Sequence, residues 1–340
     1  MFSGGINVEE GYKFGKNALA FSQKFGGDVW ECRVAAAVYG CINIWKEPLQ
    51  PCLDELKRAY LLGLGSGDIE YAVLNACLYI WNCFEYMPVD QLELAIRNLF
   101  ERMAVLNQAG SLLSLKPAWQ MCQNFLGRNH NPKYLLGEAL TREDLADSVC
   151  IDNHYELRSS IGADEMVMAY HFSDYEMAEA RLPCAVLLYN NVSTISAANA
   201  RMYHALILLA TTKTSNWRRI RKVKQLLKQM RKWSNSCPEN YLGRQLLVEA
   251  ELAGVQKKVE IAYSKFYLAI IQFRDSRCLL FEALANERAG RFCASVGDKD
   301  KANKFLNEAL KVYSDWGAIA KCEHLKLEME TAIMCLTCNN

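Results

Sequence analysis

The residues best placed to do chemistry in this sequence are the thiols and the imidazole near its carboxyl end. Cys335 and Cys338 form a Cys-x-x-Cys pair, and Cys322 and His324 precede it. A structural zinc site needs four ligands in a tetrahedron, usually from two such pairs or from one pair and two histidines. Because the chain offers one pair, we expect incidental thiols on a frayed tail, residues 335–340, and we predict neither a metal site nor a cofactor.

A nucleotide-binding loop and a catalytic histidine are the other two candidates for chemistry. Gly63, Gly65 and Gly67 resemble a glycine-rich loop, but no strand precedes them and no Lys-Ser/Thr pair follows. The five histidines are scattered, and none pairs with a cysteine or an acid at a recognisable catalytic spacing. We therefore expect a helix-to-helix turn at the glycines and predict that the chain is not an enzyme.

Charge is distributed unevenly along the chain. Lys and Arg number 39 and Asp and Glu 38, so the net charge is +1. No acid occurs between Ala180 and Pro238, a stretch that holds eleven basic residues. The rest of the chain then carries 28 basic and 38 acidic residues, a net charge of −10. The basic stretch is the strongest local signal in the sequence for a contact with something acidic.

The segment from Trp217 to Trp233 concentrates this charge on one predicted helix. Apolar residues at 220, 223, 227 and 230 form one helical stripe, which makes the segment a basic amphipathic helix. Its candidate partner-binding residues are Arg218, Arg219, Arg221, Lys222, Lys224, Lys228, Arg231 and Lys232. They could contact an acidic protein surface, serve as a calmodulin-like target, or bind RNA or an acidic membrane. They could instead pair with acidic neighbouring helices within the fold.

Helical periodicity runs through the whole chain and places this segment in an all-α fold. Apolar residues recur three or four positions apart, whereas alternating strand patterns with two-residue turns do not occur. Short polar breaks separate the helices. They lie at residues 26–28, 65–68, 129–132, 236–238 and 297–298.

These helices repeat with a spacing of small and large residues that resembles the tetratricopeptide pattern. Second-helix anchors fall at Cys52, Ala178, Ala262 and Ala302, at multiples of about 42 residues. We predict about eight antiparallel helix pairs stacked in a right-handed superhelix with a concave face, as a single array over residues 1–334. An irregular helical bundle is the alternative.

The cysteine pattern and the lack of long apolar segments are the sequence features that indicate the cellular compartment of the protein. Fourteen cysteines are scattered along the chain, and no secretory signal precedes them. The longest apolar runs fall well short of the roughly 20 residues that span a bilayer. We expect reduced thiols, no transmembrane segment and a cytoplasmic protein.

Several longer segments resemble one known region. They are residues 217–233, Cys237–Asn240, Leu246–Leu252, Glu282–Phe292, Ala309–Tyr313 and Trp316–Lys321, with weaker matches at Trp45–Leu49 and residues 67–72. Together they are similar to the helical-repeat region of large multidomain signalling proteins. In those proteins the region stands beside a serine/threonine-kinase-like domain, a predicted AAA-type ATPase, GAF or PAS sensors and a histidine kinase. The resemblance is weaker between residues 85 and 175.

The resemblance implies a regulatory role rather than a catalytic one, because the enzymatic domains of that family lie outside these 340 residues. It implies a scaffold for protein–protein interaction in signal transduction. The expected partner is a kinase, an ATPase or a sensor module, either in a separate protein or in the same full-length polypeptide. The alternative function is a polyanion-binding helical-repeat protein that uses the basic helix at 217–233.

Overall fold

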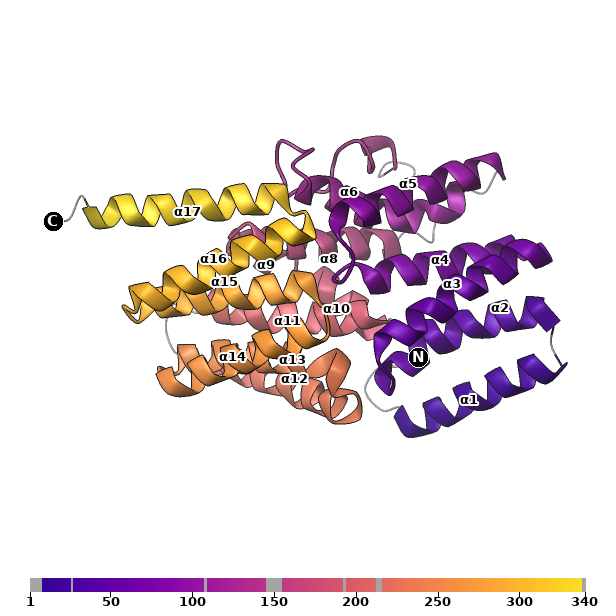
Figure 1. Ribbon diagram of the computed structural model, residues 1–340, viewed down its shortest axis with the longest axis horizontal. Coiled ribbons are helices and arrows are strands. Elements are labelled where there is room, and N and C mark those ends of the chain that lie inside the picture. Colours follow the sequence, from indigo (N-terminus) through magenta and orange to yellow (C-terminus); the bar gives the residue numbers. More distant parts are fainter. Residues whose placement is uncertain are drawn as a thin grey trace.

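The chain folds into helices joined by short turns in a computed structural model (Figure 1). The structure describes residues 8–25, 27–106, 109–144, 155–191, 194–211 and 216–337. Within these ranges there is no strand, so the all-α prediction is confirmed. No helix in the described residues has the length and apolar character needed to cross a bilayer.

The amino-terminal helices form one side of the molecule, at the right of Figure 1. The glycine-rich segment at 65–68 is the predicted helix-to-helix turn, because α3 ends at Ser66 and Gly67 adopts a φ of +80°. The elements of this half are α1 (Val8–Phe25), α2 (Gly27–Ala37), the π-helix η1 (Val38–Ile42), the 3-10 helices η2 (Asn43–Trp45) and η3 (Ala109–Leu115), α3 (Leu49–Ser66), α4 (Ile69–Cys83), α5 (Val89–Val105) and α6 (Lys116–Phe125).

The remaining helices form the middle and the left of Figure 1. They are α8 (Tyr155–His171), α9 (Tyr175–Ala180), α10 (Leu182–Asn191), α11 (Ile195–Ala210), α12 (Trp217–Ser236), α13 (Pro238–Val255), α14 (Val259–Asp275), α15 (Leu279–Ser295), α16 (Lys299–Trp316) and α17 (Ile319–Thr337). Residues 338–340, in the predicted tail, lie outside the described residues.

The carboxyl-terminal helices have the regular spacing that the sequence predicts. The first helices of successive pairs, α13, α15 and α17, begin at Pro238, Leu279 and Ile319, which are 41 residues (279 − 238) and 40 residues (319 − 279) apart. Gly297 closes the turn between α15 and α16 with a φ of +86°. A Cβ at Gly290 would lie 2.7 Å from the Leu306 side chain, so a small residue is needed where these two helices cross.

The predicted repeat with its second-helix anchor at Ala178 is interrupted. A second helix would continue beyond this anchor, but α9 ends at Ala180 and α10 begins at Leu182. Pro183 has no backbone N–H to donate to the preceding turn, and its ring excludes a continuous helix. Arg181 bridges the break: its N–H donates to the carbonyl of Met177, and its own carbonyl accepts from Cys184.

Segments from the two ends of the chain are in direct contact, which an array stacked in one direction does not anticipate. Asn240 in α13 donates to the carbonyls of Ile44 (2.8 Å) and Glu47 (2.9 Å) and accepts from the N–H of Leu49. Trp316 in α16 donates through Nε1 to the carbonyl of Met87 (2.9 Å). One apolar core therefore continues from the amino-terminal to the carboxyl-terminal helices.

Candidate functional site

The basic helix predicted at 217–233 exists as α12, Trp217–Ser236. Asn216 caps its first turn, because the Asn216 side-chain oxygen accepts from the N–H groups of Arg218 (3.1 Å) and Arg219 (3.4 Å). No acidic residue stands in that first turn, where a carboxylate would interact favourably with the helix dipole. The basic side chains there lie at the end of the helix where positive charge is least favourable.

The apolar stripe of α12 packs into the fold as predicted. Val223, Leu227 and Met230 are buried, and Ile220 is partly buried. The two terminal tryptophans differ in their exposure to solvent. Trp233 is buried, with its ring 5.1 Å from that of Trp45, whereas the Trp217 side chain is 63% exposed. The stripe fixes the orientation of the helix, so its basic side chains face outward on a rigid support.

Two of the eight candidate partner-binding residues are used within the fold. Arg219 forms an ion pair with Glu179 (2.7 Å) and donates to the Thr211 hydroxyl. Arg231 forms an ion pair with Glu249 (2.8 Å), which also binds Lys265. The idea that the basic face pairs with acidic neighbouring helices therefore holds at these two positions.

The other six basic side chains point to solvent and share one property: none forms an ion pair within the described part of the chain. These six unpaired cations are Arg218, Arg221, Lys222, Lys224, Lys228 and Lys232. Several of them are four residues apart on the same helix, as are Lys224, Lys228 and Lys232. Like charges at this spacing destabilise a helix by about 0.2–0.5 kcal/mol per pair. The surface therefore carries an electrostatic cost that the fold itself does not offset.

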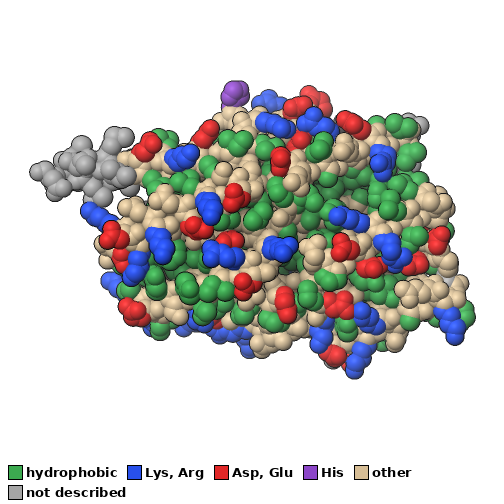
Figure 2. Space-filling view, viewed as in Figure 1, with side chains coloured by type: hydrophobic (Ala, Val, Ile, Leu, Met, Phe, Trp, Pro, Cys, Tyr) green, Lys and Arg blue, Asp and Glu red, His purple; other side chains and the backbone are tan. Residues whose placement is uncertain are grey.

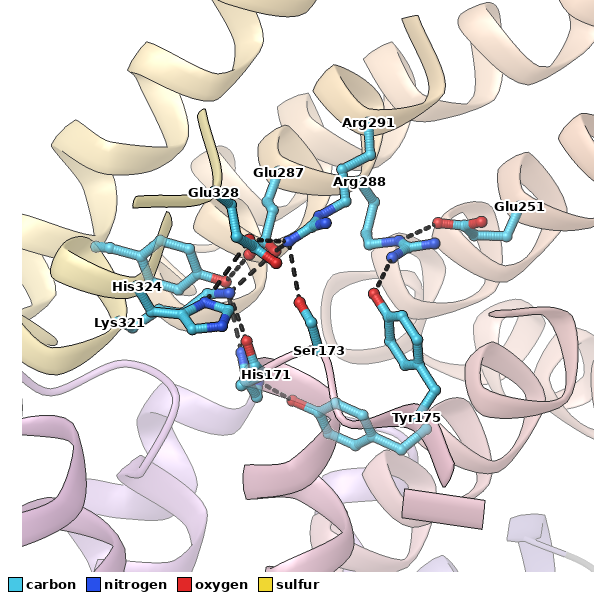
Figure 3. A network of polar contacts seen from close by, with 12 residues as sticks. His171, Ser173, Tyr175, Glu251, Glu287, Arg288, Arg291, Lys321, His324 and Glu328 are labelled. Carbon is cyan, nitrogen blue, oxygen red and sulfur yellow. Dashed lines mark hydrogen bonds and ion pairs between the residues drawn. The ribbon is translucent and has the colours of Figure 1, made fainter. Parts of the chain in front are cut away.

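A second charged region lies inside the molecule, between α8, α15 and α17 (Figure 3). Its centre is Glu287, a buried carboxylate. Lys321 donates to Glu287 Oε1 (3.0 Å), Arg291 donates to the same oxygen (2.8 Å), and Tyr313 donates to Oε2 (2.9 Å). Arg291 also pairs with Glu328 and donates to the hydroxyl of Ser173 (3.2 Å). We call this set the Glu287 network.

His171 joins the Glu287 network from α8. Its Nε2 lies 2.7 Å from the Tyr203 hydroxyl, and its carbonyl accepts from Lys321. Burial, together with the nearby Lys321 ammonium, lowers the pKa of His171 to about 3. Burial raises the pKa of Glu287, but Lys321 and Arg291 lower it more, so the carboxyl remains ionised. The network thus combines a neutral imidazole with a compensated carboxylate.

Two further ion pairs, one partly buried and one buried, extend the polar interior. Arg288 donates to Glu251 and to the Tyr175 hydroxyl (2.9 Å), and it links α15 to α9 and α13. Nearer the amino-terminal half, Arg244 lies 3.6 Å from Glu85. Burial raises the pKa of Glu85 to about 7 although Arg244 opposes the shift. These side chains join helices distant in sequence.

The sequence prediction did not include the Glu287 network, although one signal was available. Glu287 follows Ala283 by four residues and precedes Gly290 by three, so it lies on the apolar stripe of its own helix. A carboxylate at a core position needs a buried cationic partner. That partner, Lys321, is a residue of the following repeat, 34 positions along the chain.

The structure offers no metal centre in the described residues. The Cys335 side chain and Cys338 lie outside those residues. Cys322 donates to the Leu310 carbonyl (3.6 Å), and His324 Nδ1 lies 3.6 Å from Glu328 rather than beside a thiol. Buried cysteines elsewhere are protonated: burial raises the pKa of Cys52 to about 12.

Comparison with known proteins gives no family for this chain. No protein-family model matches the sequence, and no curated protein matches it significantly. The geometry of α12 and of the buried network is therefore the basis for a functional proposal.

Proposed function

We propose that this protein is a non-catalytic helical-repeat scaffold whose six unpaired cations on α12 bind an acidic surface of a partner protein. The observation that carries the proposal is the combination of a buried apolar stripe with outward cations that have no acidic partner in the described chain. A preformed surface loses little conformational freedom on binding, and complementary charge accelerates encounter.

Charged side chains elsewhere in the fold differ from the six unpaired cations of α12. Elsewhere, charged side chains such as Arg288 and Glu251 are matched within the fold, whereas the six unpaired cations of α12 have no acidic partner in the described part of the chain. Like-charge repulsion along α12 would be relieved by carboxylates of a partner. The resemblance of the sequence to repeat regions of signalling proteins directs the search to a kinase, an ATPase or a sensor module, and a role in signal transduction is part of this proposal.

The alternative is a polyanion such as RNA or an acidic membrane. Single-stranded nucleic acid binding without sequence preference uses aromatic side chains on which bases stack. Of the two aromatic side chains on α12, only Trp217 is exposed, because Trp233 is buried. Binding would then rest on phosphate contacts alone and would weaken steeply with salt, with a log–log slope of about −0.7 to −0.9 per contact.

The test is an affinity capture from nuclease-treated native lysate with three forms of the chain. They are the wild type, a reversal of Arg218, Arg221, Lys222 and Lys224 to Glu, and a control that reverses four exposed lysines outside α12, Lys258, Lys299, Lys304 and Lys311. We expect the wild type and the control to retain a kinase, ATPase or sensor protein that the α12 reversal loses. Equal capture by all three forms would overturn the assignment to α12. Recovery of nucleic acid or lipid instead would favour the alternative.

A further inference from the structure

A second surface feature is independent of α12. A groove of about 210 Å³ lies between α3, α4 and α5, on the opposite half of the molecule. Figure 2 shows hydrophobic side chains gathered on this face between α4 and α5. The groove is lined by Leu56, Lys57, Tyr60, Ala76, Tyr79, Ile80, Ala95, Asn98, Leu99 and Arg102.

The hollow exists because small side chains stand where larger ones would fill it. Ala76 on α4 and Ala95 on α5 lie among Leu56, Ile80 and Leu99, so the floor is apolar. The volume falls below the ~300–1,000 Å³ of sites for drug-sized ligands. An occupant of this groove is therefore smaller than a drug-sized ligand.

The polar groups at the rim are the cations of Lys57 and Arg102, the phenols of Tyr60 and Tyr79, and the amide of Asn98. Arg102 Nη1 donates to the Tyr60 hydroxyl (3.0 Å), which joins α5 to α3 beside the groove. Lys57 Nζ lies 4.7 Å from the centre of the Tyr79 ring. Among the described residues, no carboxylate lines the groove. The hydrogen bond to Tyr79 raises the pKa of Lys57, and the nearby Asp54, which does not line the groove, also raises it.

This combination of an apolar floor and a cationic rim fits one class of ligand. We propose that the groove binds a small amphipathic carboxylate, with the aliphatic part over Ala76 and Ala95 and the carboxylate at Arg102 and Lys57. Arginine and lysine form charge-assisted hydrogen bonds with carboxylates, and these bonds are stronger than neutral ones. The neighbouring hydroxyls of Tyr60 and Tyr79 are additional donors at the same rim.

Isothermal titration with octanoate tests the proposal, because octanoate has an eight-carbon chain and one carboxylate. Octyltrimethylammonium is the matched probe, with the same tail and the opposite charge. We expect octanoate to bind the wild type and octyltrimethylammonium to bind at least tenfold more weakly. We also expect Arg102→Gln and Lys57→Gln each to weaken octanoate binding about tenfold, as for loss of a charge-assisted bond. Lys258→Gln, on another surface, should leave it unchanged.

A variant that fills the groove distinguishes octanoate binding in the groove from binding to surface charge in general. Ala95→Met places a larger apolar side chain in the hollow at a partly exposed position, and should abolish octanoate binding while circular dichroism stays unchanged. If Ala95→Met fails to fold, Asn98→Leu at the exposed rim is the second filling variant. Equal binding of both probes, no heat with octanoate at millimolar concentration, or binding unaffected by Arg102→Gln would each overturn the proposal. None of these outcomes bears on α12.

Discussion

The basic face of α12 and the Glu287 network hold charge in opposite ways. In the network, Glu287 is buried and receives bonds from Lys321, Arg291 and Tyr313. On α12, six cations are exposed and none is paired within the described residues. Buried charges without partners are strongly destabilising, whereas exposed ones cost little. The charges of the network are therefore compensated within the fold, whereas the six exposed cations of α12 have no acidic partner in the described residues.

The largest expected effect follows from removing one partner in the network. Lys321→Met leaves Glu287 buried with fewer cations, which should lower the free energy of unfolding by about 3–5 kcal/mol. Urea unfolding measures it, and Lys222→Met on α12 is the matched control, with a change within about 0.5 kcal/mol. Adding Glu287→Gln to Lys321→Met should restore part of the loss. A loss below about 1 kcal/mol would remove the contrast between the two regions.

The second prediction concerns pH and depends on His171. Its pKa is about 3 in the folded chain and about 6.5 when unfolded, so the unfolded state binds more protons between these values and stability falls as pH decreases through that window. From pH 6.5 to pH 5 the His171 contribution should fall by about 2 kcal/mol. His171→Gln should lose that part of the pH dependence, whatever its stability at pH 7. An identical pH profile for both forms would contradict a buried neutral imidazole.

A third prediction compares two arginines on α12 itself. Arg219 is partly buried and binds Glu179 through two nitrogens, whereas Arg221 is exposed and unpaired in the described residues. Arg219→Gln should therefore cost about 1 kcal/mol of unfolding free energy. Arg221→Gln should change it by less than about 0.5 kcal/mol. If both substitutions lower the unfolding free energy equally, ion pairing within the fold does not distinguish cations that stabilise the fold from cations that are available to a partner protein.

The smallest expected effect is a gain in stability. Lys228 has Lys224 and Lys232 four residues away on either side, so Lys228→Gln removes two like-charge contacts. Unfolding free energy should rise by a few tenths of a kcal/mol at low salt. The gain should vanish in 1 M salt, where the screening length is about 3 Å. Lys304→Gln on α16 is the control, and a loss of stability from Lys228→Gln would show that this lysine serves the fold.

Sequence reasoning predicted α12 because the information is local. The 3.6-residue period alone places Val223, Leu227 and Met230 on one buried face. The position of Glu287 on an apolar stripe was a signal for a buried charge, but its partners could not be assigned from the sequence, since His171 and Lys321 are 150 positions apart and meet only after the chain has folded. The contacts of Asn240 with Ile44 are equally non-local. The break at Pro183, by contrast, was predictable from the missing N–H of proline.

The ion pairs that Arg219 and Arg231 form within the fold could not be predicted from the sequence either. From sequence, all eight basic residues of α12 are equivalent, because nothing local distinguishes them. Their acidic partners, Glu179 and Glu249, belong to other helices. Only the packing of α12 between its neighbours decides which cations are used within the fold.

The most direct test of the central claim is a lysine-labelling footprint of the chain with and without the captured partner protein. Acetylation rates would be read by mass spectrometry at Lys222, Lys224, Lys228 and Lys232, and at the exposed control lysines Lys258, Lys299 and Lys304. We predict that the partner slows labelling of the α12 lysines and leaves the control lysines unchanged. Protection confined to the control lysines, with α12 labelled at its free rate, would contradict the assignment of α12 as the contact surface.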